Sequence, residues 1–293
     1  MLLKRNQRFW KSKRNTYKRR RNYGRTFRQK RIRKCSRILK QRRQLTELTD
    51  KKNKLLDTFF KIYFRNSLKR NFYRINIKGK ETLERIKSIS QKQNSPVIIC
   101  VNHSNWWDGV LLNWISHYLI GKESYCLMDT TDLNRHSYFN RIGALPLERK
   151  NKFNSYRTLK YCSKLLENRN RYLWIFPQGE LIPAERKPFK FYNGVSMISE
   201  DMSRLHILCV YFEYKFTFHQ RPEIYIDFFN TFEKKDTENK SRKEITMFLE
   251  KLFNDQATNF SECFASNDLK DYQIMLSGKK SVNERKITRT KLK

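Results

Sequence analysis

Apolar and polar residues form alternating blocks along the chain, and these blocks predict strands and helices in turn. The continuous apolar run PVIICV, residues 96–101, is typical of a strand buried on both faces of a sheet. Apolar residues spaced by three and four in FNSYRTLKYCSKLLEN, residues 153–168, predict an amphipathic helix. Because the two patterns alternate between residues 72 and 265, we predict an α/β domain with a mixed, largely parallel sheet flanked by helices.

The same patterns place the individual elements. We expect strands at residues 72–79, 96–101, 124–130, 171–176, 206–216 and 223–230. We expect helices at residues 81–93, 106–120, 153–168 and 241–260, with a further loop that leads into a helix at 188–201. Ser241 and Glu244 have the spacing of a capping box at the start of the last long helix. Residues 134–150 are expected to form a loop with a short helix.

Three segments flank this domain. Residues 44–71 form an amphipathic helical segment, whose apolar face either packs on the domain or lies on a membrane surface. Residues 1–43 form a basic arm that we expect to be disordered, and residues 266–293 a basic tail. No run reaches the roughly 18–20 apolar residues that a membrane-spanning helix needs.

The net charge of +36 is concentrated at the N-terminus, where residues 1–50 hold 20 Lys and Arg against Glu47 and Asp50. Such an arm attracts polyanions, so nucleic acid and an anionic lipid surface both fit. A solvated tail and an organelle-targeting segment are further interpretations. The six cysteines are scattered without a CxxC pair, which favours reduced thiols and gives no zinc signature. We expect neither a metal nor a bound cofactor.

Two of the expected strands end in polar turns, which places candidate catalytic residues at one edge of the sheet. PVIICV runs into Asn102 and His103, and RYLWIF runs into Pro177, Gln178 and Gly179. In open α/β sheets, sites lie beyond the carboxyl ends of the strands. A neutral imidazole can take a proton from a hydroxyl, and a carboxylate on its other nitrogen fixes its tautomer. Asp108, five residues after His103, is the candidate orienter.

Three later segments accompany this NHxxxxD pattern in order: IGALPLERK, WIFPQGELIPAERKPFKFYNGV and HILCVYFEY. Together the four blocks, within residues 72–230, resemble those of the glycerolipid acyltransferases, which include the lysophosphatidic acid and glycerol-phosphate acyltransferases. The resemblance implies transfer of an acyl group from coenzyme A or acyl carrier protein to a hydroxyl of a lipid acceptor, above all 1-acyl-glycerol-3-phosphate. His103 would be the general base, and Asp108 would orient it.

The resemblance also implies which residues contact the substrates. The acceptor side would comprise Asn102, Gly143, Arg149, Pro177, Gln178, Gly179 and Glu180, with Arg149 holding an anionic group. The acyl chain would lie in a groove lined by three tryptophans of the expected helix at 106–120, Trp106, Trp107 and Trp114. Core packing is the alternative for these aromatic residues.

The third block departs from the family pattern at two positions. Gln178 replaces the usual acid, and Glu180-Leu181 replaces the usual Thr-Arg. A phosphate-free lipid hydroxyl, as on a glycolipid or carotenoid glycoside, is therefore an alternative acceptor. Loss of catalytic activity is a second alternative. A nucleic-acid-binding protein acting through the basic arm is a third, of another class.

The expected partners are the acyl donor, the lipid acceptor and an anionic membrane surface, with weak polyanion binding by residues 1–43. We infer no specific protein partner. We expect a peripheral protein on the cytoplasmic side of a membrane, or in an organelle such as a plastid or mitochondrion.

Overall fold

The computed structural model describes residues 48–282 and 284, and an eight-stranded sheet forms its centre. The strand order is β4-β3-β5-β2-β6-β7-β1-β8. The strands are β1 (Arg74–Lys78), β2 (Val97–Val101), β3 (Ser124–Asp129), β4 (Ala144–Leu147), β5 (Tyr172–Ile175), β6 (His206–Lys215), β7 (Glu223–Glu233) and β8 (Gln273–Ser277). Neighbours pair in parallel except β6–β7 and β1–β8, which are antiparallel. The mixed, largely parallel sheet expected from the sequence is confirmed.

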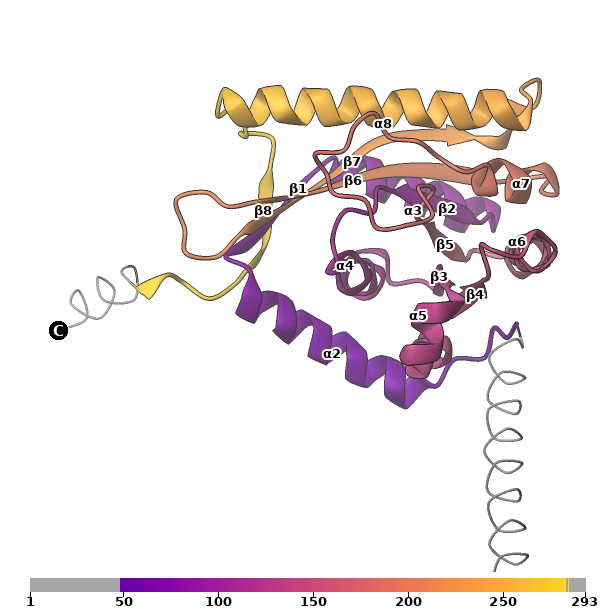
Figure 1. Ribbon diagram of the computed structural model, residues 1–293, viewed down its shortest axis with the longest axis horizontal. Helices are drawn as coiled ribbons and strands as arrows, with labels where there is room; N and C mark the ends of the chain where they lie inside the picture. Colours follow the sequence, from indigo (N-terminus) through magenta and orange to yellow (C-terminus); the bar gives the residue numbers. More distant parts are fainter. Residues whose placement is uncertain (1–47, 283, 285–293) are drawn as a thin grey trace, which may run out of the picture. The chain divides into compact units, whose positions relative to one another are not determined.

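Helices cover both faces of the sheet (Figure 1). The α-helices are α2 (Lys54–Asn71), α3 (Lys80–Gln93), α4 (Asp108–Ile115), α5 (Thr130–Arg135), α6 (Lys152–Leu166), α7 (Gly194–Glu200) and α8 (Arg242–Ala265). A π-helical turn, η1 (Ser116–Ile120), continues α4, and the 3-10 turns are η2 (Ser137–Ile142) and η3 (Lys234–Thr237). One apolar core joins α2, α3 and α4 to the sheet, and a second joins α6, α7 and α8 to it.

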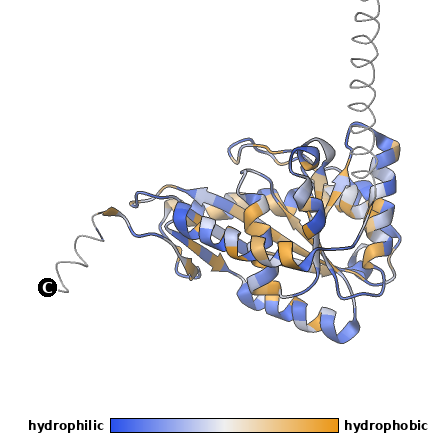
Figure 2. Cartoon of the chain, turned by 90° about the horizontal axis from the view of Figure 1, so that it is seen from below, coloured by the Kyte–Doolittle hydropathy of each residue, from blue (hydrophilic) through white to orange (hydrophobic). Residues whose placement is uncertain are grey.

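Strand β2 illustrates why the sequence folds in this way. Val97, Ile99 and Val101 belong to the core beneath α2 and α4, whereas Ile98 and Cys100 belong to the opposite core. All five are buried, because side chains alternate between two covered faces. Figure 2 shows the same arrangement, with apolar colour gathered at the centre and hydrophilic colour on the outer helices.

Several local expectations are confirmed and two are corrected. The Ser241 hydroxyl accepts from the Glu244 backbone N–H and the Glu244 carboxylate accepts from the Ser241 N–H, which completes the capping box of α8. Residues 134–150, expected as a loop with a short helix, also contain β4, whose four residues are too few to show a period. Strand β8 lies within the expected tail, so the sheet extends past residue 265.

The segment before the domain contains one helix, α2, from Lys54 to Asn71. It packs against α4 and η2, and its residues Phe60, Phe64 and Leu68 belong to the same apolar core as these elements. The basic arm, residues 1–43, lies outside the described residues. No helix in the described part of the chain is both long and apolar enough to cross a membrane.

Candidate active site

The carboxyl ends of four neighbouring parallel strands bring the candidate residues to one rim of the sheet. Strand β2 leads into His103, and its parallel neighbour β5 leads into Gln178 and Gly179. Next to β5, β3 ends at Asp129, and the edge strand β4 leads into Arg149. The expectation that the two polar turns share a rim is therefore confirmed.

His103 and Asp108 form a hydrogen-bonded pair at this rim. The His103 Nδ1 lies 2.9 Å from Asp108 Oδ2. A carboxylate only accepts, so Nδ1 carries the hydrogen, and in the neutral imidazole the lone pair is then on Nε2. Within the described residues Nε2 has no hydrogen-bond partner, and the imidazole is 24% exposed. The geometry leaves a basic nitrogen accessible to a substrate hydroxyl.

Asp108 is fully buried at the first position of α4 and is held by four donors. Besides the imidazole, the backbone N–H groups of Ser104 and Asn105 donate to Oδ2, each at 2.9 Å. The Tyr214 hydroxyl donates to Oδ1 at 2.6 Å. The turn folds back because one carboxylate satisfies donors from three successive positions, and the helix N-terminus favours its charge.

Tyr214, on β6, is a site residue that the sequence analysis missed. Burial and the neighbouring Asp108 charge raise the pKa of its hydroxyl well above the ordinary value, so Tyr214 stays a neutral donor to Asp108. It lies in an apolar strand 106 residues after Asp108, and no local pattern marks it.

The turn after β5 supports His103 from the other side. The Gln178 side-chain oxygen accepts the His103 backbone N–H at 2.6 Å, and the Phe176 ring stacks on the imidazole with a centroid distance of 4.1 Å. The Ile182 N–H donates to the His103 carbonyl at 2.9 Å. Gln178 is 2% exposed, so its side chain positions His103. An amide oxygen accepts this N–H as a carboxylate oxygen would.

Arg149 lies between two carboxylates. Its Nε is 3.3 Å from Asp129 Oδ2, and one terminal nitrogen is 3.6 Å from Glu180 Oε2. The pKa of Asp129 is lowered: partial burial raises it, but hydrogen bonds from Thr131 and Arg149 outweigh that effect. The single positive charge of Arg149 thus faces two negative charges.

Residues 74–213 match the family model described as Acyltransferase. The match covers 140 of the 293 residues, so this part of the chain is similar to acyltransferases. The match supports an enzyme that transfers acyl groups in general. The matched segment contains the His103–Asp108 pair, Arg149 and the turn after β5. No curated protein matches the chain by sequence.

Asn102 and Gly143, which the resemblance assigns to the acceptor side, each have a structural contact within the fold. Asn102 is fully buried, and its amide exchanges hydrogen bonds of 2.9 and 2.8 Å with the backbone of Phe212 on β6, so it continues the sheet. Gly143 precedes β4 whereas Arg149 follows it, so the strand separates them to opposite ends. Gly143 has φ +109°, and a Cβ there would lie 2.7 Å from the Lys52 side chain.

At the rim itself, Pro177 is buried and its carbonyl accepts the Tyr192 N–H at 2.8 Å. Gly179 has φ +72°, and a Cβ there would lie 2.9 Å from the Tyr192 ring. The Arg149 side chain passes close to the same point, at 3.5 Å. Gly179 therefore allows Arg149 and Tyr192 to approach the turn closely.

The three tryptophans expected to line an acyl groove do not share one. Trp106 is 69% exposed, Trp107 packs edge-on against Phe72, and Trp114 is buried in the core. Neighbouring positions of a turn point in different directions, and Trp114 lies on the inner side of α4. A cavity of about 620 Å³ lies instead between α2, α4 and β3, and none of the three lines it. Within the described residues, no group of His, Cys, Asp or Glu is arranged to hold a metal.

Proposed function

We propose that this protein is an O-acyltransferase that moves a fatty acyl group from a thioester donor, coenzyme A or acyl carrier protein, to a hydroxyl of a lipid acceptor. The observation that carries the proposal is the His103–Asp108 pair, with its free Nε2 at the rim of a domain similar to acyltransferases. A buried carboxylate that orients a partly exposed imidazole suits the activation of a hydroxyl.

In the proposed reaction, His103 Nε2 takes the proton of the acceptor hydroxyl while its oxygen attacks the thioester carbonyl. The tetrahedral intermediate then collapses, and the carbon–sulfur bond breaks. The leaving thiolate takes the proton back from the His103 imidazolium, so the products are an ester and a thiol. Asp108 stabilises the imidazolium while it exists, and Tyr214 together with the two backbone N–H groups holds Asp108 in place.

For the acceptor, the two candidates differ in whether they carry a phosphate. A 1-acyl-glycerol-3-phosphate needs a free cation at Arg149, as the family resemblance implies. The carboxylates of Asp129 and Glu180 beside Arg149 favour instead a phosphate-free lipid hydroxyl, as on a glycolipid. A phosphate brought to Arg149 meets the repulsion of both carboxylates.

The decisive experiment measures thiol release from an acyl-CoA against a panel of lipid acceptors with and without phosphate. We expect acceptor-dependent release, reduced about 10²–10⁴-fold in His103→Ala, which is the range that a general base contributes. The matched control is His136→Ala, because His136 is an exposed histidine whose side chain contacts Tyr138 and not His103 or Asp108. Thiol release that persists in His103→Ala at more than a few per cent of the wild-type rate would refute the base.

We also propose that the protein docks on an anionic membrane surface, where its lipid substrates reside. The support is the outward side of α2, where Leu55 is 85% and Phe59 57% exposed among lysines and arginines. Apolar side chains flanked by cations suit an anionic interface. Sedimentation with anionic and with neutral vesicles tests this docking, and sedimentation with RNA tests the nucleic-acid alternative. The basic arm, to which that alternative refers, lies outside the described residues.

A further inference from the structure

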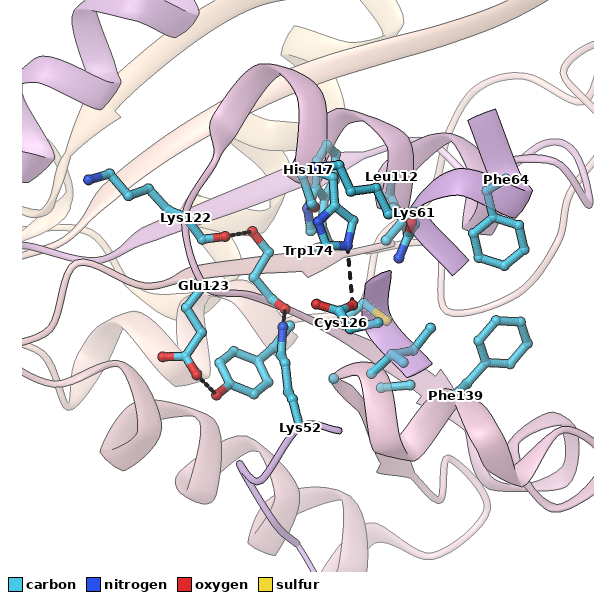
Figure 3. A pocket seen from close by; sticks show the side chains of 18 of the residues that line it. Lys52, Lys61, Phe64, Leu112, His117, Lys122, Glu123, Cys126, Phe139 and Trp174 are labelled. Carbon is cyan, nitrogen blue, oxygen red and sulfur yellow. Dashed lines mark hydrogen bonds and ion pairs between the residues drawn. The ribbon is translucent and has the colours of Figure 1, made fainter. Parts of the chain in front are cut away.

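A cavity of about 620 Å³ lies between α2, α4 with its π-helical continuation η1, and the first residues of β3 (Figure 3). Its size is within the range of small-molecule sites. Gly109, which follows Asp108, is one of its lining residues. Ser124, the first residue of β3, is another, and lies roughly 16 Å along that strand from Asp129 at the rim.

Four lysines line this cavity: Lys52, Lys54, Lys61 and Lys122. Within the described residues none of the four forms an ion pair with a carboxylate. The Lys52 ammonium donates to the Ser124 carbonyl and lies 4.5 Å from the centroid of the Tyr125 ring. Its pKa is lowered because the side chain is largely buried.

The two carboxylates that line the cavity are already engaged by other groups. Asp57 Oδ1 is 3.1 Å from His117 Nε2. Glu123 accepts from Arg171 at 2.6 Å and from the Tyr125 hydroxyl at 2.6 Å. The lysine ammoniums therefore exceed the carboxylates that are left to balance them, and the cavity is suited to an anion.

Apolar side chains line the part of the cavity that lies away from Lys52. Phe64 of α2, Leu112 of α4 and Trp174 of β5 are buried there, and Phe139 lies beside them (Figure 3). Lys61 lies beside Leu112 and Phe64, whereas Lys52 lies on the other side of Trp174 (Figure 3), so the cavity has both cationic and apolar lining. A ligand that satisfies both kinds of lining has one anionic group attached to an aliphatic chain.

We propose that this cavity binds an anionic amphiphile, with its carboxylate or phosphate at Lys52 and Lys61 and its aliphatic chain against Phe64, Leu112 and Phe139. The site is separate from the candidate acceptor site, because Lys52 is bound to Ser124 at the amino end of β3 whereas Arg149 lies beyond the carboxyl end of β4. Binding there needs neither the proton transfer at His103 nor a thioester, so the proposal stands apart from the proposed reaction.

The test is calorimetric titration of the full chain with dodecanoate, dodecyl phosphate and dodecanol, each below its micelle-forming concentration. We expect both anions to bind saturably at one site and at least about tenfold more tightly than dodecanol, because hydrogen bonds to charged groups are the strong ones. The ratio of the dissociation constants of the two anions distinguishes the sources of the ligand. Tighter binding of dodecanoate indicates a free fatty acid, and tighter binding of dodecyl phosphate indicates a lysophospholipid.

Charge-removing variants test the location of the site. Lys52→Gln combined with Lys61→Gln should weaken binding of dodecanoate about tenfold or more. The control combines Lys69→Gln with Arg70→Gln, two cations of α2 that do not line the cavity, and should bind as the wild type does. Equal binding of dodecanoate and dodecanol by the wild type would overturn the proposal. So would equal weakening in the two double variants, or the absence of saturable anion binding.

Discussion

Asp108→Asn is the substitution that isolates the negative charge behind His103. In the wild type, Asp108 Oδ2 receives the His103, Ser104 and Asn105 N–H groups, and Oδ1 receives the Tyr214 hydroxyl. An asparagine has the same shape. Its oxygen can keep the three N–H donors if its amide nitrogen faces Tyr214, whose hydroxyl can turn to accept. The fold and the histidine tautomer then survive, and only the charge is lost.

The expected magnitude follows from what that charge does. Without it the imidazolium that forms in the transition state has no counter-charge, so most of the benefit of a general base is lost. That benefit is about 10²–10⁴-fold in rate, or about 3–5 kcal/mol in activation free energy. The free energy of unfolding should fall less, by about 1–2 kcal/mol, because hydrogen bonds to a charged acceptor become hydrogen bonds to a neutral one.

The assay is thiol release with the best acceptor of the panel, together with chemical denaturation of the same preparations. The matched control is Asp268→Asn, a carboxylate that is 53% exposed and pairs with Lys270. It should leave both the rate and the stability within error. Suppose that His103→Ala is inactive in this assay but that Asp108→Asn keeps more than half of the wild-type rate. That result would show that His103 needs no oriented carboxylate.

Three further predictions concern the acceptor side and the stability of the domain. Glu180→Thr should raise activity on phosphate-bearing acceptors relative to phosphate-free ones about five- to tenfold, because Arg149 loses one carboxylate; an unchanged ratio would contradict this reading. Gly179→Ala should lower the free energy of unfolding by about 1–2 kcal/mol, because φ is +72° and the new Cβ meets the Tyr192 ring; denaturation measures it. Burial raises the pKa of Glu223, but three hydrogen-bonding side chains bring it below 4.5. Its stabilisation is therefore present above pH 4.5 and lost as pH falls further, so Glu223→Gln should flatten the decline in unfolding free energy between pH 5 and 3.

Much of the fold could be predicted from the sequence, because apolar residues recur at different spacings in its strands and helices. The β2 run is apolar throughout since both faces of the strand are covered, and α8 carries a capping box and an apolar stripe. The edge strands were not readable. β4 has only four residues, and most side chains of β8 are exposed, so its apolar and polar positions alternate only weakly. Neither segment can therefore be distinguished from a loop by its sequence pattern.

The site was readable only where its parts are close in sequence. His103 and Asp108 lie five residues apart on one turn, so their contact follows from a strand end and a helix start. Tyr214 and Phe176 reach the same pair from other strands, and no local spacing indicates them. Gly143 shows the converse: a short spacing to Arg149 suggested one site, but the strand between them places them at opposite ends of the sheet.

The acceptor side differs from the base side in how firmly its charges are held. Asp108 is fully buried with four donors, whereas the Arg149 side chain is 35% and the Glu180 side chain 56% exposed. An ion pair so exposed contributes at most about 1 kcal/mol, so Glu180 does not block Arg149 by occupying it. Its effect on an approaching phosphate is repulsion at a distance, which salt screens over about 10 Å at 0.1 M. Discrimination against phosphate-bearing acceptors should therefore weaken as ionic strength rises, whereas the dependence on His103 and buried Asp108 should not.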